Sequence, residues 1–99
     1  ALLKEAMSLA KDKAERQLIL TRARAVRTIE TLRWLLTYLD DPEVCEAACE
    51  TIVDLARQRF LRTPNQQEFN AALKKVIATS KVQEVADAAR MLAAGIGWD

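Results

Sequence analysis

Apolar residues recur along this chain mostly at intervals of three and four, which is the spacing of one face of an α-helix. Polar stretches interrupt the pattern and leave six predicted helices, at residues 1–10, 13–25, 29–39, 42–61, 64–79 and 82–94. Because the turns between them are only two to four residues long, consecutive helices are expected to be antiparallel neighbours. The pattern therefore predicts an all-α fold with almost no strand.

Each predicted helix has an apolar side that should face a common core. In the third helix a second, partly exposed stripe is formed by Trp34 and Tyr38. From the second helix to the sixth, the residues expected to point inward are Ala14, Leu18, Thr21 and Ala25; Ile29, Leu32, Leu35, Leu36 and Leu39; Val44, Ala48, Ile52, Leu55 and Ala56; Phe69, Ala72, Leu73, Val76 and Ile77; and Val82, Val85, Ala86, Ala89, Leu92 and Ala93.

Four of the helix starts carry a side chain that can cap a helix N-terminus, namely Asp12, Thr28, Asp41 and Thr63. Asp41 and Thr63 are each followed by proline, which is favoured at the first helical position because its missing N–H costs nothing there. Gln66 lies three residues after Thr63, as a capping box requires. These signals define the corners at residues 40–42 and 62–66.

The stretch from Thr28 to Ala56 resembles a HEAT repeat, in which a first helix ending in L-x-x-L-L-x-x-L is followed by D-D-P and by a second helix opening with V-x-x-A-A. Here these elements are residues 32–39, 40–42 and 44–48, with weaker echoes of the second-helix opening at 82–86 and 14–18. Recurrence about every 30 to 38 residues favours an open stack over a closed bundle. The resemblance implies a right-handed α-α superhelix of six antiparallel helices in three HEAT-like pairs, at about 1–26, 27–62 and 63–96.

As a whole the chain is similar to the compact HEAT-type modules of large multidomain bacterial proteins, often exported ones beside carbohydrate-related or cytochrome-like domains. The resemblance implies a periplasmic or exported location, and without it a cytoplasmic one is expected. Because the chain opens on Ala1 within a helical pattern, we expect a fragment of a larger protein. Cys45 and Gln83 stand where many HEAT repeats carry an arginine that interacts with an aspartate of a neighbouring turn.

The residue inventory does not favour an enzyme. The chain has no histidine and no phosphate-binding glycine loop, and its two cysteines, Cys45 and Cys49, have no base partner in sequence. Cys45 and Cys49 are expected to be reduced packing residues, so no metal and no cofactor is predicted. Glu46 and Glu50 share a helical face, but nothing apolar is predicted to enclose them. No apolar run approaches the roughly 20 residues of a membrane span.

The net charge of +1 conceals three blocks of opposite sign. Residues 11–33 hold seven basic and three acidic side chains (+4), residues 40–54 hold six acidic and no basic ones (−6), and residues 57–75 hold five basic and one acidic (+4). Such segregation suits electrostatic recognition, and it equally suits helices that each turn one charged face to solvent.

Two functions remain open, and the first is a scaffold or protein–protein interaction module that binds a protein partner or a neighbouring domain. The resemblance implies that the second helix of each pair lines one surface, and the candidate residues on it are Arg16, Arg24, Glu43, Glu46, Glu50, Asp54, Arg57, Glu84, Asp87 and Arg90. Apolar residues at the two ends also predict a tendency to pack end to end or to dimerise: Leu2, Leu3, Met7, Met91, Ile96 and Trp98.

The alternative is a nucleic-acid-binding domain that uses the arginines of the second and third helices: Arg22, Arg24, Arg27 and Arg33. The acidic block at residues 40–54 would lie beside any phosphate track, and the net charge is far from that of strongly basic domains. Nucleic acid is therefore the less favoured partner.

Overall fold

The computed structural model describes residues 6–7, 9–10 and 12–95, and every regular element in this part of the chain is helical. The all-α prediction is therefore confirmed. The elements are α2 (Lys13–Arg22), η1 (Ala23–Ala25), α3 (Ile29–Leu36), α4 (Cys45–Ala56), α5 (Arg59–Arg62), η2 (Thr63–Asn65), α6 (Gln66–Thr79) and α7 (Gln83–Ala93). Of the first predicted helix, residues 6, 7 and 9 are helical, and residues 1–5 lie outside the described part.

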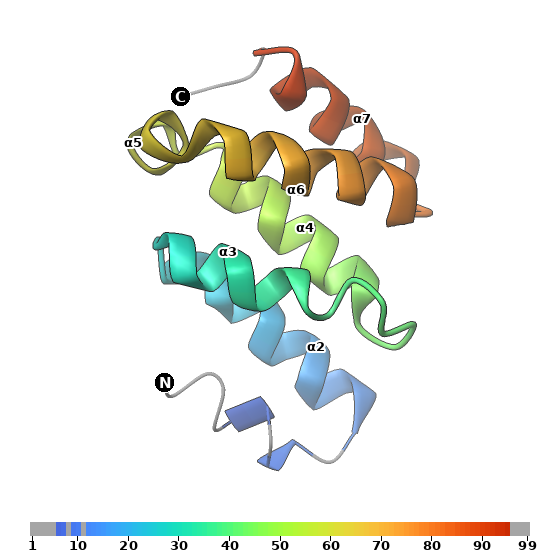
Figure 1. The fold of residues 1–99 in the computed structure, drawn as a ribbon. Helices are drawn as coiled ribbons and strands as arrows, with labels where there is room; N and C mark the ends of the chain where they lie inside the picture. The colour runs from blue at the N-terminus through green and yellow to red at the C-terminus, as the bar shows by residue number, and fades with distance from the viewer. Residues whose placement is uncertain (1–5, 8, 11, 96–99) are drawn as a thin grey trace.

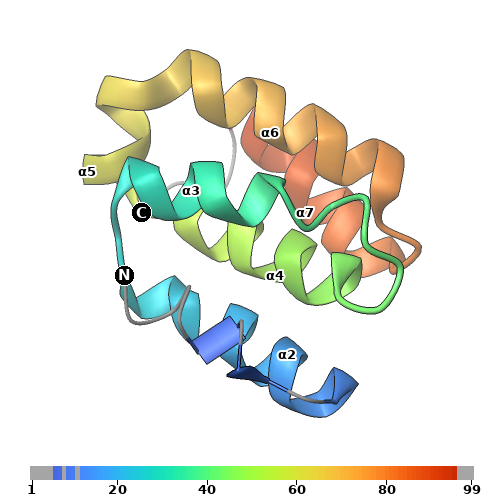
Figure 2. The same ribbon diagram turned by 60° about the horizontal axis from the view of Figure 1, so that its bottom comes forward.

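The helices form two layers, as the two views in Figures 1 and 2 show. One layer holds α3 and α6, and the other holds α2, α4 and α7. Helix α4 occupies the centre, because it contacts α2, α3, α6 and α7. The most extensive helix–helix contact is between α6 and α7.

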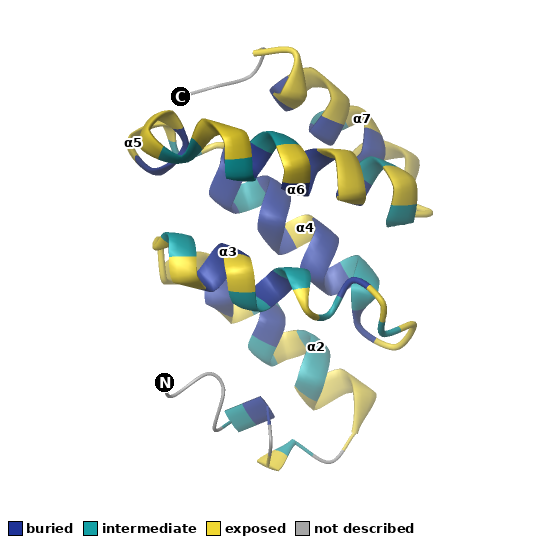
Figure 3. Ribbon diagram, in the orientation of Figure 1, coloured by how far each residue is buried: buried dark blue, intermediate teal, exposed yellow. Residues whose placement is uncertain are grey.

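The core is centred on α4, which runs through the middle of Figure 3 almost entirely in the colour of buried residues. Eight of its twelve residues are buried, so it packs on nearly all sides. Phe69 and Leu73 of α6 and Leu32 and Leu35 of α3 complete the centre, each with no exposed surface. All four were predicted to face inward, as were Ala48, Ile52, Leu55 and Ala56 of α4, which are also buried.

The predicted caps are confirmed at two helix starts and partly right at a third. Asp12 Oδ1 accepts a hydrogen bond from the Glu15 N–H (2.8 Å), and Thr28 Oγ1 accepts one from the Thr31 N–H (3.3 Å). Asp41 Oδ1 accepts from the Glu43 N–H (3.0 Å), as a capping aspartate does. However, this bond closes a turn over residues 42–44, and the regular helix begins only at Cys45.

The cap predicted at Thr63 is wrong. Residues 63–65 form the short helix η2 with Pro64 in its first turn, and α6 begins at Gln66. The residue before α6 is Asn65, whose side chain donates to the carbonyl of Leu61 (2.9 Å) and makes no capping bond. The η2 turn keeps the chain helical through the corner, so Thr63 and Gln66 do not meet as a capping box.

Two predicted helix ends also differ from the structure. The helix predicted over 42–61 is divided at Arg57 and Gln58 into α4 and α5, and Gln58 is extended (φ −81°, ψ 102°). The break redirects the chain so that Leu61 and Arg62 are buried while Phe60 is 62% exposed. The third helix ends at Leu36 rather than 39, and residues 37–40 form turns.

The inward face predicted for the second helix is wrong, because Ala14, Leu18 and Ala25 are exposed. The buried residues in this segment are instead Leu20 of α2 and Ala23 of η1. Apolar residues surround α2 on several sides, so the face that contacts α4 is chosen by packing and not by periodicity. Two residues of the last helix, Val82 and Ala93, are likewise exposed where burial was predicted.

The two proposed apolar ends differ from one another. Met91 on α7 is half exposed (50%), as expected for an open end, whereas Met7 is buried (7%), so its prediction as an exposed edge is wrong. Leu2, Leu3, Ile96 and Trp98 lie outside the described residues.

Candidate interaction surface

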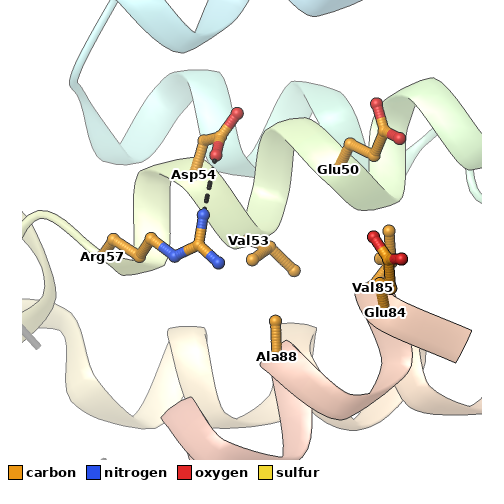
Figure 4. A pocket seen from close by; sticks show the side chains of 7 residues that line it. All are labelled: Glu50, Val53, Asp54, Arg57, Glu84, Val85 and Ala88. Carbon is orange, nitrogen blue, oxygen red and sulfur yellow. Dashed lines mark hydrogen bonds and ion pairs between the residues drawn. The ribbon is translucent and has the colours of Figure 1, made fainter. Parts of the chain in front are cut away.

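The outer side of the layer formed by α2, α4 and α7 contains two adjoining hollows. The first, about 210 Å³, lies between α4 and α7 and is lined by Glu50, Val53, Asp54, Arg57, Glu84, Val85 and Ala88 (Figure 4). The second, about 330 Å³, lies between η1 and α4 and is lined by Arg24, Ala25, Arg27, Asp54, Arg57 and Gln58. Asp54 and Arg57 line both hollows, which therefore adjoin, and the two together are called here the α4 groove.

The floor of the first hollow is apolar because small side chains meet where α7 passes α4. Val53 of α4 is almost fully buried and points toward Ala88 of α7 in Figure 4. Val85, one turn earlier on α7, is half-buried and packs against the same core. A larger side chain at Ala88 would occupy the hollow.

The end of the groove near the C-terminus of α4 is basic. Asp54 Oδ1 lies 3.3 Å from Arg57 Nη1, and its Oδ2 lies 3.7 Å from Arg24 Nη1. Arg27 lines the same hollow, and no ion pair joins it to another described residue. Three arginines against one carboxylate leave a formal charge of +2 at this end.

The other end of the groove is acidic. Glu50 of α4 and Glu84 of α7 both line the first hollow and are exposed to solvent. Neither carboxylate makes an ion pair with another residue of the described chain. The groove therefore changes from negative to positive along α4, with an apolar floor between the two ends.

Arg16 and Glu43 were predicted on this surface, but they hold two segments of the chain together. Arg16 donates from Nη2 to Asp41 Oδ2 (2.5 Å) and from Nη1 to Glu43 Oε1 (3.0 Å). Gln17 adds a hydrogen bond to the carbonyl of Glu43 (3.0 Å). The hydrogen bond from Arg16 lowers the pKa of Asp41. We call this contact of α2 with the corner before α4 the Arg16 bridge.

Glu46 makes a similar contact between α4 and the corner before α7. Its carboxylate accepts hydrogen bonds from the Ser80 hydroxyl (2.8 Å) and from the Lys81 N–H (2.5 Å), at the corner between α6 and α7. This contact, the Glu46 bridge, joins α4 to that corner. When residues 14–18, a weaker echo of the second-helix opening at 44–48, are aligned with it, Arg16 and Glu46 occupy the same position.

Asp87 and Arg90 were also predicted on the surface, and they lie on an exposed side of α7 without lining either hollow. Asp87 accepts from Gln83 Nε2 (2.8 Å) and from Arg90 Nη1 (3.0 Å). These are contacts within one helix, between residues three or four positions apart, and they contribute little to stability.

The structure thus brings together five of the ten predicted surface residues: Arg24, Glu50, Asp54, Arg57 and Glu84. The groove residues that were not predicted on this surface are Ala25, Arg27, Val53, Gln58, Val85 and Ala88. Arg27 was available from the sequence, where it was assigned to the nucleic-acid alternative. Val53 and Ala88 carried no signal, because small apolar residues on a helix do not show which neighbour they will face.

The arginines of the nucleic-acid alternative are divided between the two layers. Arg33 of α3 makes a bidentate contact with Glu68 of α6, from Nε to Oε2 (3.1 Å) and from Nη2 to Oε1 (2.7 Å). Arg24 contacts Asp54 in the other layer. Arg33 and Arg24 therefore each already have a carboxylate partner within the described chain.

The cysteines are free thiols, with Cys49 buried and Cys45 half-buried. Burial raises the pKa of the Cys49 thiol to about 12, and the nearby Glu46 carboxylate adds to the effect. The thiol of Cys49 is therefore protonated at neutral pH and is a poor nucleophile or metal ligand. Within the part of the chain that the structure describes, no three acidic or cysteine side chains are grouped as a metal site would require.

The chain matches no protein-family model, no curated protein and no solved structure. Its similarity to HEAT repeats therefore depends on the corner at residues 40–42 and on the apolar residues on either side of it. Among the described helices, none combines the length and the apolar character needed to cross a membrane.

Proposed function

We propose that this chain is a HEAT-like helical-repeat module without catalytic activity, which binds a protein partner, or a neighbouring domain of its parent protein, through the α4 groove. The observation that carries the proposal is the groove itself. It is a depression with an apolar floor and with charges of opposite sign at its two ends, on the layer formed by α2, α4 and α7. Depressions of this kind can orient a partner through charge and bind it through apolar contact.

The repeat organisation we propose has three pairs, at about residues 1–26, 27–62 and 63–96. The pairs are the first helix with α2, α3 with α4, and α6 with α7. Two observations support it: α2, α4 and α7 share one layer, and the Arg16 and Glu46 bridges each join a second helix to the corner of the following pair. In a stack of this kind each pair contacts only its neighbours.

The absence of catalysis and cofactors in this proposal rests on the kinds of residue available. The chain has no histidine, and the Cys49 thiol is held protonated by burial. Glu50 and Glu84 face an open groove, where water screens their charges. Binding of a partner requires only apolar contact and charge complementarity, and the residues that line the groove can supply both.

A protein partner is favoured over nucleic acid because of the acidic end. A phosphate backbone drawn to Arg24, Arg27 and Arg57 would continue past Glu50 and Glu84, which would repel it. A folded protein or a peptide can match both ends. Self-association through the exposed Met91 is a second contact that this proposal allows.

Site-specific photo-crosslinking in cells of the source organism tests the proposal. A photo-reactive phenylalanine analogue at Ala25 lies at the rim of the second hollow on an exposed residue, so it does not fill the first hollow. The matched control at Ala71 lies on an exposed side of α6 in the other layer. We expect a discrete crosslink from position 25, to another protein or within the parent chain, that Arg57→Glu abolishes. Equal crosslinking from positions 25 and 71, or a crosslink that Arg57→Glu leaves unchanged, would refute the groove as the binding surface.

A further inference from the structure

We infer that the α4 groove binds an extended peptide segment with the pattern acidic–x–apolar–x–basic. This inference rests on the proposed function and specifies its partner. Its basis is the arrangement of three features along one helix: the arginines at one end, the apolar floor around Val53 and Ala88, and the carboxylates at the other end.

The size of the first hollow limits what can enter it. About 210 Å³ compares with the roughly 150 Å³ of an engineered cavity that holds benzene. There is room for one aliphatic side chain against Val53, Val85 and Ala88. A helix with its side chains is about 10 Å across, which is too wide to insert between α4 and α7. The hollow therefore suits a single apolar side chain from an extended segment.

The spacing of the charges fits the same segment. Glu50 and Arg57 are seven residues apart on α4, which at 1.5 Å per residue separates their Cα atoms by about 10 Å. In an extended peptide alternate side chains point to the same side, and residues two before and two after a central one are about 13 Å apart. An apolar side chain in the hollow thus places its neighbours at ±2 over the two charged ends.

The charges decide which residues those neighbours are. An acidic side chain fits the basic end, where Arg24, Arg27 and Arg57 surround only Asp54. A basic side chain fits the end where Glu50 and Glu84 make no ion pair with other described residues. Because these groups are exposed, each pair contributes modestly, and recognition depends on matching both ends together with the apolar side chain.

The test uses two peptides of identical composition added to the ¹⁵N,¹³C-methyl-labelled chain. The first, acetyl-Gly-Asp-Ser-Leu-Ser-Lys-Gly-amide, has the inferred pattern. In the second, acetyl-Gly-Ser-Asp-Leu-Lys-Ser-Gly-amide, the charged residues adjoin leucine and point away from it when the peptide is extended. We expect the first peptide to shift the methyl signals of Val53, Val85 and Ala88, and the second to bind about tenfold more weakly.

Charge reversal provides the second part of the test. Arg57→Glu lowers the formal charge of the basic end from +2 to zero, because Arg24 and Arg27 would then face Asp54 and a second carboxylate. The variant should lose affinity for the first peptide, and it should bind a version with lysine in place of aspartate more tightly than the unmodified chain does. The matched control is Arg59→Glu, an exposed arginine of α5 outside both hollows, which should change neither affinity. Circular dichroism establishes that both variants are folded.

Three results would overturn the inference: equal affinity for the two peptides, equal effects of Arg57→Glu and Arg59→Glu, or methyl shifts outside the groove. Binding of a single-stranded oligonucleotide at low salt, with shifts at the same methyl groups and no response to peptide, would also overturn it. If position 25 crosslinks to a protein and the peptides do not bind, the peptide pattern is wrong and the proposed function stands. If there is neither a crosslink nor peptide binding, both the inference and the proposed function fail.

Discussion

Replacing Glu46 by glutamine should weaken the corner between α6 and α7 without disturbing the α4 groove. The carboxylate of Glu46 accepts two hydrogen bonds, from the Ser80 hydroxyl and from the Lys81 N–H. Glutamine has one carbonyl oxygen, which can accept from the Lys81 N–H, and an amide group that can only donate to the Ser80 hydroxyl oxygen. Both contacts lose the negative charge of the acceptor and are therefore weakened. The side chain fits the same space, so the change is electrostatic rather than steric.

The expected loss follows from the strength of such bonds. A hydrogen bond to a charged group contributes about 1.5–3 kcal/mol, and the lower value applies because Glu46 is only half-buried. We therefore expect the free energy of unfolding to fall by about 1.5 kcal/mol. For a domain of about 100 residues this corresponds to a decrease in melting temperature of roughly 6–12 °C.

Urea unfolding followed at 222 nm measures the loss, with Glu50→Gln as the matched control one turn along the same helix. Glu50 makes no hydrogen bond or ion pair with other described residues, so its replacement should cost less than about 0.5 kcal/mol. Glu46 lies in the first turn of α4, so its replacement also removes a favourable interaction with the helix dipole, which urea unfolding does not separate from the loss of the bridge. Hydrogen exchange of the Lys81 amide reports on the bridge alone, and this exchange should accelerate only in Glu46→Gln. Equal urea midpoints for the two variants, or unchanged exchange at Lys81, would refute the Glu46 bridge.

Three further predictions concern the core, the thiols and the acid limit of stability. Leu55→Ala should lower the free energy of unfolding, measured with urea, by about 2–5 kcal/mol because Leu55 has no exposed surface. Leu18→Ala, at a half-exposed position of α2, should lower it by less than about 1 kcal/mol. Similar losses in the two variants would contradict the observed exposure of Leu18 on α2. Cys45 should react with a thiol reagent in the folded protein and Cys49 only on unfolding, and mass spectrometry that finds both modified at equal rates would contradict the burial of Cys49. The hydrogen bond from Arg16 lowers the pKa of Asp41 below its usual 3.8, so the Asp41 carboxylate stabilises the fold fully above about pH 4, and this stabilisation is lost as the pH falls through the folded-state pKa. Asp41→Asn should therefore flatten the decline of urea midpoints from pH 4 to 2. An unchanged decline would contradict the Arg16 bridge.

The parts of the fold that follow from local chemistry could be predicted from sequence. Asp12 and Thr28 cap their helices with an N–H three residues away, so the partner of each cap is visible in sequence. The break at Gln58 is different. It allows Arg62 to be buried and to donate to the carbonyl of Leu92, thirty residues further on. No proline or glycine marks residues 57–58, so the helical pattern predicts a continuous helix there.

The candidate site was half predictable for a similar reason. Charge and helical spacing placed Glu50, Asp54 and Arg57 on one exposed face, and the structure agrees. The same reasoning placed Arg16 and Glu46 there, although their partners are 25–35 residues away in sequence. Whether a charged residue binds a partner or holds the fold together depends on which corner packs beside it, and a single helix does not contain that information.

The two bridges also bear on whether helix pairs can be exchanged between copies of this chain. Arg16 meets carboxylates at its corner, whereas Glu46 meets a hydroxyl and a backbone N–H. If a misassembled dimer placed α4 of one copy where α2 of the other belongs, Glu46 would face Asp41 and Glu43, and three carboxylates would lie together. Electrostatic repulsion therefore opposes that misassembly.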